Sequence, residues 1–220
     1  MVFADRREAG RRLAARLAHL QGSDPVVVGL PRGGVPVAFE VARALAAPLD
    51  VLVVRKLGVP FQPELAMGAI GEGDAMVVDE DVVWGTGISP AAFARVETHE
   101  RAALHARLQR FRGGRPAVPL GGRTVVVVDD GIATGSTARA ACRVARDRGA
   151  ARVVLAVPVA PADWTSRLHD AADELVAVAT PEPFHAVGAW YDDFSPTTDD
   201  QVMAYLDAAA PATPDPRQRF

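Results

Sequence analysis

The stretch VVVVDDGIATGST, residues 125–137, joins an anion-binding pattern to a pair of acids. Four consecutive valines are typical of a strand that is buried on both faces of a parallel sheet. The loop after them turns into a helix, so its backbone N–H groups and the helix N-terminus can hold a phosphate without a cationic side chain. The candidate phosphate-binding residues are Ala133, Thr134, Gly135, Ser136 and Thr137.

Two aspartates, Asp129 and Asp130, stand between the valines and this loop. Carboxylates repel phosphate, so they are expected to meet a different part of the ligand. Their oxygens accept hydrogen bonds from sugar hydroxyls, and they are also ligands for Mg²⁺. A ribose 5-phosphate satisfies both halves of the pattern, with its phosphate in the loop and its diol at the acids.

Other ligand classes fit the stretch less well. A P-loop needs a GK[ST] motif, but the only lysine, Lys56, follows Arg55 in another segment. An acidic pocket of the receiver type would not need the TGST loop, and the GxGxxG pattern of a dinucleotide site does not occur in it. A strand-turn-helix with a purely structural role stays open as an alternative.

Two more loops follow predicted strands and carry positive charge. PRGG follows the apolar run Val26–Leu30, and RKLG follows Asp50–Val54. Because the carboxyl ends of parallel strands share one sheet edge, both loops should lie near the acids. Lysine and arginine together number 24, and Lys56 is the single lysine. Its position indicates a need for a compact point charge, with chance placement as the alternative.

These motifs resemble those of the type I phosphoribosyltransferases. VVVVDDGIATGST is similar to that family's motif for phosphoribosyl diphosphate (PRPP), GLPRGGVPVA to its diphosphate loop, and VVRKLG to the Arg-Lys pair of adenine-type members. The chain as a whole, with its RKLG-x-P-x-x-x-E stretch and its WYDDF segment, is similar to a group of bacterial phosphoribosyltransferase-like proteins. The resemblance indicates the type of reaction but does not identify the acceptor.

The resemblance implies a role for each motif. Asp129 and Asp130 would bind the ribose hydroxyls and Mg²⁺, directly or through water, and residues 133–137 would bind the 5-phosphate. The diphosphate would meet Arg32, Gly33, Gly34, Arg55 and Lys56, with a non-proline cis peptide near Arg32–Gly33. The catalytic residues would be Asp129, Asp130, Lys56 and Arg55.

The alternation of apolar runs and helical segments predicts an α/β fold: a doubly wound, mainly parallel sheet with a small hood from terminal segments. We expect one domain over residues 1–208, with an N-terminal helix at 5–20, a core at 26–179 and a hood at 180–206. Residues 209–220 are expected to be a disordered tail. Further helices are expected at Val35–Ala46, Ser89–Arg112, Ser136–Arg148 and Ala162–Ala172. Residues 57–68 are interpreted as a loop that could act as a mobile lid.

Composition narrows the function classes. The net charge of −3 and the pI near 6.0 do not favour a nucleic-acid partner. One cysteine, Cys142, excludes an intrachain disulfide and a cysteine-based metal cluster. No apolar run approaches the roughly 20 residues that span a bilayer. We therefore expect a cytoplasmic protein with no membrane partner, and a homo-oligomer, most simply a dimer.

The expected reaction displaces diphosphate from C1 of PRPP by a nitrogen nucleophile, most simply a base that the hood covers. The hood candidates are Phe184, Trp190, Tyr191, Asp192 and Phe194. The aromatic rings could stack on a flat base or only cap the sheet edge, and Asp192 could accept hydrogen bonds from ring N–H groups. Two other functions stay open: a PRPP-binding regulator without turnover, and a hydrolase that uses water in the same pocket.

Overall fold

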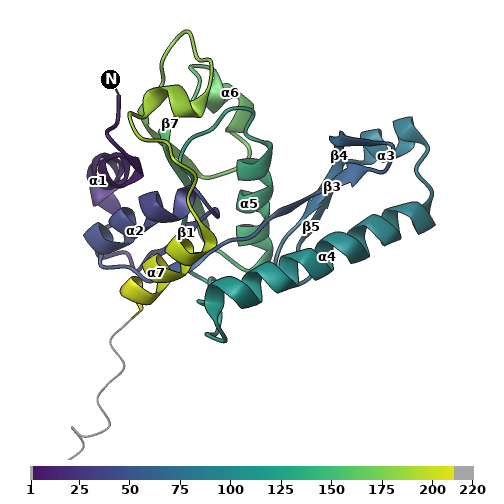
Figure 1. The fold of residues 1–220 in the computed structure, drawn as a ribbon, viewed down its shortest axis with the longest axis horizontal. Coiled ribbons are helices and arrows are strands. Elements are labelled where there is room, and N and C mark those ends of the chain that lie inside the picture. The colour runs from purple at the N-terminus through teal and green to yellow at the C-terminus, as the bar shows by residue number, and fades with distance from the viewer. Residues whose placement is uncertain (1, 211–220) are drawn as a thin grey trace, which may run out of the picture.

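The centre of the computed structural model, which describes residues 2–210, is a parallel sheet of five strands (Figure 1). Each strand pairs in parallel with its neighbours, so the predicted α/β fold is confirmed. In spatial order the strands are β2 (Leu49–Val51), β1 (Val26–Gly29), β6 (Thr124–Val128), β7 (Arg152–Val159) and β8 (Glu174–Ala179).

The valines of β6 alternate between two hydrophobic layers. Val126 and Val128 pack in the core that includes α1 (Arg6–Arg16) and α2 (Gly34–Leu45), while Val125 and Val127 pack in the core that includes α5 (Ser136–Asp147). Figure 1 shows α1 and α2 on one side of the sheet and α5 on the other. Burial on both faces explains why residues 125–128 of this strand have no polar position before Asp129.

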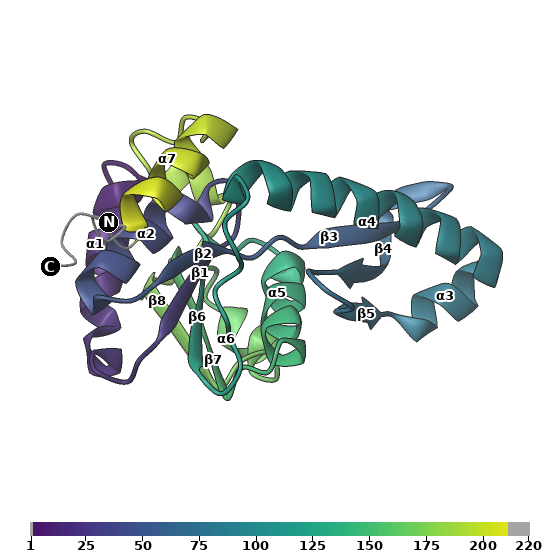
Figure 2. The same ribbon diagram turned by 90° about the horizontal axis from the view of Figure 1, so that it is seen from below.

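A second, antiparallel sheet projects from the core as an arm (Figures 1 and 2). It consists of β3 (Arg55–Val59), β4 (Gln62–Ile70) and β5 (Met76–Val78), followed by α3 (Glu80–Thr86) and the long α4 (Pro90–Arg112). Ser89 caps α4 and Pro90 begins it, in agreement with the helix expected at Ser89–Arg112.

The interpretation of residues 57–68 as a loop is wrong, because they form most of the β3–β4 hairpin. The prolines that suggested a loop lie where they do not interrupt pairing. Pro60 is in the tight turn, and Pro63 lies beside a register shift at Gly58. Leu57 and Met67 are fully buried in the core that α4 shares, which explains why the segment is ordered as strands.

Four other differences between expectation and structure exceed one residue. The strand expected at Asp50–Val54 is the shorter β2, and the helix expected at Ala162–Ala172 is only α6 (Trp164–Leu168). The N-terminal helix expected at 5–20 is α1 followed by a 3-10 turn at Ala18–Leu20, and a second 3-10 turn covers Val187–Trp190.

The fourth difference is α7 (Asp199–Ala209), a helix in the hood that the sequence analysis missed. Its signal is a capping box, in which Thr198 accepts from the Gln201 backbone and the Gln201 side chain accepts from the Thr198 backbone. The disordered tail was expected from residue 209, which is still helical, and residues 211–220 lie outside the described residues. Within residues 2–210, no helix combines the length and the apolar character needed to cross a membrane.

A buried ion network joins the arm to the core. Nε and Nη2 of Arg112, at the end of α4, lie 3.0 and 2.9 Å from the two carboxylate oxygens of Asp50. Glu72, in the turn between β4 and β5, pairs with Arg112 and also accepts from Arg148 at 3.0 Å. The pKa of Glu72 is lowered because these arginines outweigh the effect of burial. The network therefore holds α4, β2 and the base of the arm together.

Replacement of Arg112 by glutamine should test this network. The change leaves two buried carboxylates without their shared cation, and we expect the free energy of unfolding in urea to fall by about 3 kcal/mol. Arg115→Gln is the matched control, since Arg115 pairs at 2.9 Å with the exposed Asp207 and should lose less than about 1 kcal/mol. Equal losses in the two variants would contradict a special role for the network.

Candidate active site

The loop after β6 presents unused backbone donors. Gly135 has a φ of +85°, a conformation that glycine adopts without strain, and it directly precedes α5. Among residues 2–210, the backbone N–H groups of residues 133–137 have no hydrogen-bond acceptor. Arg167 of α6 donates to the carbonyl oxygens of Ala133 and Thr134 at 3.1 and 2.7 Å. The carbonyls are thus held on one side, and the amides are free to bind an anion.

The acid pair follows the same strand and lacks a full set of counter-charges. Burial of the Asp129 carboxyl, and then the charge of Asp130, raise its pKa well above the ordinary value. Burial also raises the pKa of Asp130, although Arg6 opposes the shift. Asp129 Oδ1 accepts the backbone N–H of Asp130 at 2.9 Å. A carboxyl pair with raised pKa values at a sheet edge is characteristic of a functional site.

Arg6 was not singled out from the sequence, where it is one of several arginines in the first helix. Its Nε lies 2.8 Å from Asp130 Oδ2, and its Nη1 donates to the carbonyl of Ser195 at 2.8 Å. The guanidinium also lies 3.9 Å from the centre of the Phe194 ring. Arg6 therefore connects the N-terminal helix, the acid pair and the hood.

The PRGG loop lies directly against the acids. A Cβ on Gly33 would overlap the Asp130 carboxylate, and one on Gly34 would lie 2.9 Å from the Asp129 Cα. Only glycine fits at either position without displacing the acid pair. The structure has a cis peptide at Pro31–Arg32, one bond before the position expected. Two of the predicted motifs thus meet at the carboxyl ends of β1 and β6.

Arg55 and Lys56 do not act as one pair, because neighbouring residues of a strand point to opposite faces. Arg55 faces α4, where its Nε lies 2.7 Å from Glu100 Oε2. Lys56 faces α5 and lies 3.3 Å from the Glu64 carbonyl oxygen. The sequence could not separate them, since their segment was interpreted as a loop.

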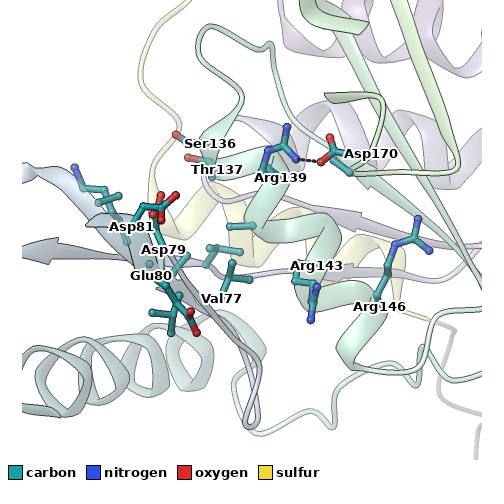
Figure 3. Close-up of a pocket in the computed structure, with 18 residues that line it drawn as sticks. Val77, Asp79, Glu80, Asp81, Ser136, Thr137, Arg139, Arg143, Arg146 and Asp170 are labelled. Carbon is teal, nitrogen blue, oxygen red and sulfur yellow. Dashed lines mark hydrogen bonds and ion pairs between the residues drawn. The ribbon is translucent and has the colours of Figure 1, made fainter. Parts of the chain in front are cut away.

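A cavity of about 660 Å³ lies between the arm and α5 (Figure 3). Lys56 lines it together with Ser136 and Thr137 of the phosphate loop. Figure 3 shows the acids Asp79, Glu80 and Asp81 on the arm side and the arginines of α5 on the other. Nothing in the sequence indicated this cavity, but it brings Lys56 to the same space as two predicted phosphate-binding residues.

The hood aromatics pack mainly on one another and on the N-terminus. Tyr191 is buried, its hydroxyl donates to the Asp130 carbonyl at 2.5 Å, and its ring lies 5.4 Å from Phe3 and 5.0 Å from Phe194. The half-buried Phe184 and Trp190 join the same cluster. Asp192 is exposed, and its backbone donates to Phe3. The hood therefore includes Phe3, which sequence reasoning did not assign to it.

The acid pair also has the chemistry of a partial Mg²⁺ site. Mg²⁺ commonly takes one or two protein carboxylates and completes its shell with water and substrate phosphates. Asp129 fits this role because its buried carboxylate is short of positive charge. Among residues 2–210, no three histidine, cysteine or acidic side chains form a closed metal site.

A glycine-rich loop, an acid pair and an anion-binding loop lie at one edge of a parallel sheet, which is where doubly wound α/β proteins bind their ligands. The family model of the phosphoribosyl transferase domain matches residues 5–182, and the chain belongs to this family. This finding confirms the resemblance that the motifs predicted.

Relatives and solved structures agree with this assignment. A Mycobacterium tuberculosis protein (strain CDC 1551 / Oshkosh), provisionally named a phosphoribosyl transferase, is 60% identical over 208 residues, or 94% of this chain and 47% of the relative. The chain therefore spans about half the length of the curated relatives it matches. The crystal structure of TT1426 from Thermus thermophilus is 46% identical, with a TM-score of 0.86 over 96% of this chain and all of that one. AQ2163 from Aquifex aeolicus, 13% identical with a TM-score of 0.50 over 91% of this chain and 85% of that one, shares the fold alone.

The raised pKa of Asp129 leads to a stability prediction. Its ionised form is disfavoured in the folded chain, so it lowers stability increasingly as pH rises from the ordinary carboxyl pKa to the raised one. Asp129→Asn keeps the acceptor for the Asp130 backbone and removes the charge. We expect the free energy of unfolding at pH 7 to rise by on the order of 1 kcal/mol, or about 2–4 °C in Tm.

The pH dependence provides the control for this prediction. The advantage of Asp129→Asn should vanish below the ordinary carboxyl pKa, where the wild-type side chain is protonated in both states. Asp170→Asn, which removes an exposed acid paired with Arg139, should give no gain at any pH. A gain that is independent of pH would mean that packing, and not charge, is responsible.

Proposed function

We propose that this chain transfers the 5-phosphoribosyl group of PRPP to a nitrogen acceptor, with release of diphosphate and a requirement for Mg²⁺. One observation carries the proposal: Gly33 and Gly34 lie against Asp129 and Asp130, at the strand edge where the loop before α5 offers free amides. Family membership supports the same chemistry. A nitrogenous base is the acceptor class that we favour.

In the proposed complex the two halves of the β6 loop bind different parts of the donor. The amides of residues 133–137 and the hydroxyls of Thr134, Ser136 and Thr137 bind the 5-phosphate. Asp129 and Asp130 accept hydrogen bonds from the ribose hydroxyls, which are donors. Arg6, which pairs with Asp130 in this structure, must then share or release that carboxylate.

Positive groups bind the departing diphosphate. Gly33 and Gly34 of the PRGG loop lie against the acids, Arg32 directly precedes them, and Lys56 faces the cavity that the phosphate loop also lines. A bound Mg²⁺ would neutralise diphosphate charge and would be held by Asp129, with Asp130 as a second carboxylate. The acids also stabilise the positive charge that develops on the sugar as the bond at C1 breaks.

The hood and the arm are the elements that we assign to acceptor binding and to assembly. Phe184 and Trp190 are half-buried hood aromatics that pack against the cluster of Phe3 and Tyr191 and keep part of their surface exposed. They are our candidates for contact with a base.

A homodimer stays a prediction, which the exposure of Phe61 (69%) and Trp84 (81%) on the arm favours.

The direct test is diphosphate release from PRPP with and without Mg²⁺, screened across nucleobases and small amines. We expect Mg²⁺-dependent release that needs an acceptor, and Asp130→Asn should reduce turnover by orders of magnitude while the chain stays folded. Release without any acceptor would instead indicate the hydrolase. PRPP binding without release would indicate the regulator, and no PRPP binding by calorimetry would exclude all three.

Lys56 provides a second test. If it stabilises the leaving diphosphate, Lys56→Ala should lower kcat more than it weakens PRPP binding, because the charge on the leaving group grows in the transition state. Lys56→Arg should restore part of the rate. Arg143→Ala is the matched control, since Arg143 lines the same cavity but pairs with Asp147 on its own helix. Parallel losses in kcat and binding would identify Lys56 as an anchor only.

A further inference from the structure

The loop that precedes α5 rests on the short helix α6. Trp164 and Leu168 of α6 are each 2% exposed and pack in the core that α5 shares. A Cβ on Gly135 would lie 3.0 Å from Leu168 Cδ1, so the loop and the helix are in close contact. Two apolar side chains therefore hold α6 in place, which leaves its polar side chains free for another role.

Arg167 of α6 binds two carbonyl groups of this loop. Its Nη2 donates to the carbonyl oxygens of Ala133 and Thr134 at 3.1 and 2.7 Å. The next carbonyl oxygen, that of Gly135, accepts the backbone N–H of Arg139 at 2.8 Å. Three consecutive carbonyl groups of the loop are therefore fixed by donors from α5 and α6.

The direction of each carbonyl group sets the direction of the next amide. In a planar trans peptide, the C=O of one residue and the N–H of the following residue point in opposite directions. Because Arg167 binds the carbonyls of Ala133 and Thr134, it directs the N–H groups of Thr134 and Gly135 away from α6. Among residues 2–210 these two N–H groups have no acceptor, and both belong to the donors that we assign to the 5-phosphate.

The charge of Arg167 is only weakly balanced. Its Nη1 lies 3.2 Å from Oδ1 of Asp163, one helical turn earlier, and an exposed pair of this kind contributes little. No other side chain among residues 2–210 forms an ion pair with Arg167. Arg139, which pairs with Asp170 at 2.7 Å, donates to the Arg167 carbonyl and fixes its backbone (Figure 3). A cation is thus held behind the loop, where its field adds to that of the amides.

We infer that Arg167 is a positioning residue for the 5-phosphate of the donor. It acts through the loop: it orients the amides of Thr134 and Gly135 and adds positive potential without touching the ligand. This inference rests on the proposed function. Residues 131–137 contain no lysine or arginine, so Arg167 supplies from behind a charge that the loop lacks. Because Arg167 contacts the loop and not the PRGG segment, its effect should be confined to the 5-phosphate half of the donor.

Calorimetric titration with ribose 5-phosphate, and separately with inorganic diphosphate and Mg²⁺, tests this role. Arg167→Gln removes the charge and should weaken the binding of ribose 5-phosphate about tenfold, because hydrogen bonds from a charged donor are lost. Arg167→Lys should recover part of the loss. The affinity for diphosphate should stay at the wild-type level in both variants.

Arg143→Gln is the matched control. Arg143 forms the same kind of pair within one helix, at 3.2 Å from Asp147, but within residues 2–210 it donates to no carbonyl of the loop. Its replacement should leave the affinity for both probes unchanged. Thermal unfolding of all variants shows whether each is folded and equally stable.

Steady-state kinetics with PRPP provides a second measurement. A residue that only positions the 5-phosphate should raise KM for PRPP in Arg167→Gln and leave kcat within about twofold, because this contact is the same in the ground state and the transition state. A general loss of loop structure would lower kcat as well.

The outcomes separate this inference from the proposed function. If ribose 5-phosphate binds and the Arg167 variants shift as expected, but PRPP releases no diphosphate with any acceptor, the role of Arg167 stands and the transfer reaction is wrong. If PRPP releases diphosphate but Arg167→Gln behaves like Arg143→Gln, the reaction stands and the role is wrong. Equal weakening of both probes, or no binding of ribose 5-phosphate by the wild-type chain, also overturns the role.

Discussion

Charge balance at the carboxyl edge of the parallel sheet is the constraint on which the rest of the structure depends. A loop that binds anions and two carboxylates lie side by side there. Because a ligand must fit between them, the loop does not neutralise the charge of the carboxylates. The fold answers with Arg6, which reaches Asp130 from the first helix. Among residues 2–210 Asp129 has no such partner, and burial and the charge of Asp130 raise its pKa. Natural proteins commonly accept this kind of cost at functional sites.

The same constraint explains why distant segments converge on one edge. Phe3 pairs with Trp190 and packs on Tyr191, so the N-terminus and the hood form one unit over the acids. The arm is fixed independently by the buried network of Arg112, which leaves Lys56 directed at the cavity beside the phosphate loop. Rigid elements thus hold groups whose charges are left incompletely paired, which is the arrangement that preorganised binding requires.

The sequence predicted the parts of the fold that local chemistry determines. The valine strand β6, the loop that turns into α5 and the helix expected at Ser89–Arg112 each formed as predicted. The hairpin of β3 and β4 was missed because its prolines mimic a loop, while its burial depends on α4, which is more than twenty residues away. The capping box of α7 is readable in the sequence, although the helix was missed. Arg6 could not have been selected, since only its tertiary contacts distinguish it from the other arginines of the first helix.

The acceptor is hidden from the sequence for a related physical reason. Aromatic residues in the hood suggest base stacking, yet Tyr191 lies between Phe3 and Phe194, and Phe194 is covered by Arg6. Rings that pack on one another stabilise the hood and offer no free face to a ligand. In the proposed reaction, selectivity for the acceptor would come from the few hood groups that remain partly exposed, such as Trp190, together with backbone groups whose direction no residue type reveals. The proposed donor site is built from motifs, whereas the proposed acceptor site is built from packing.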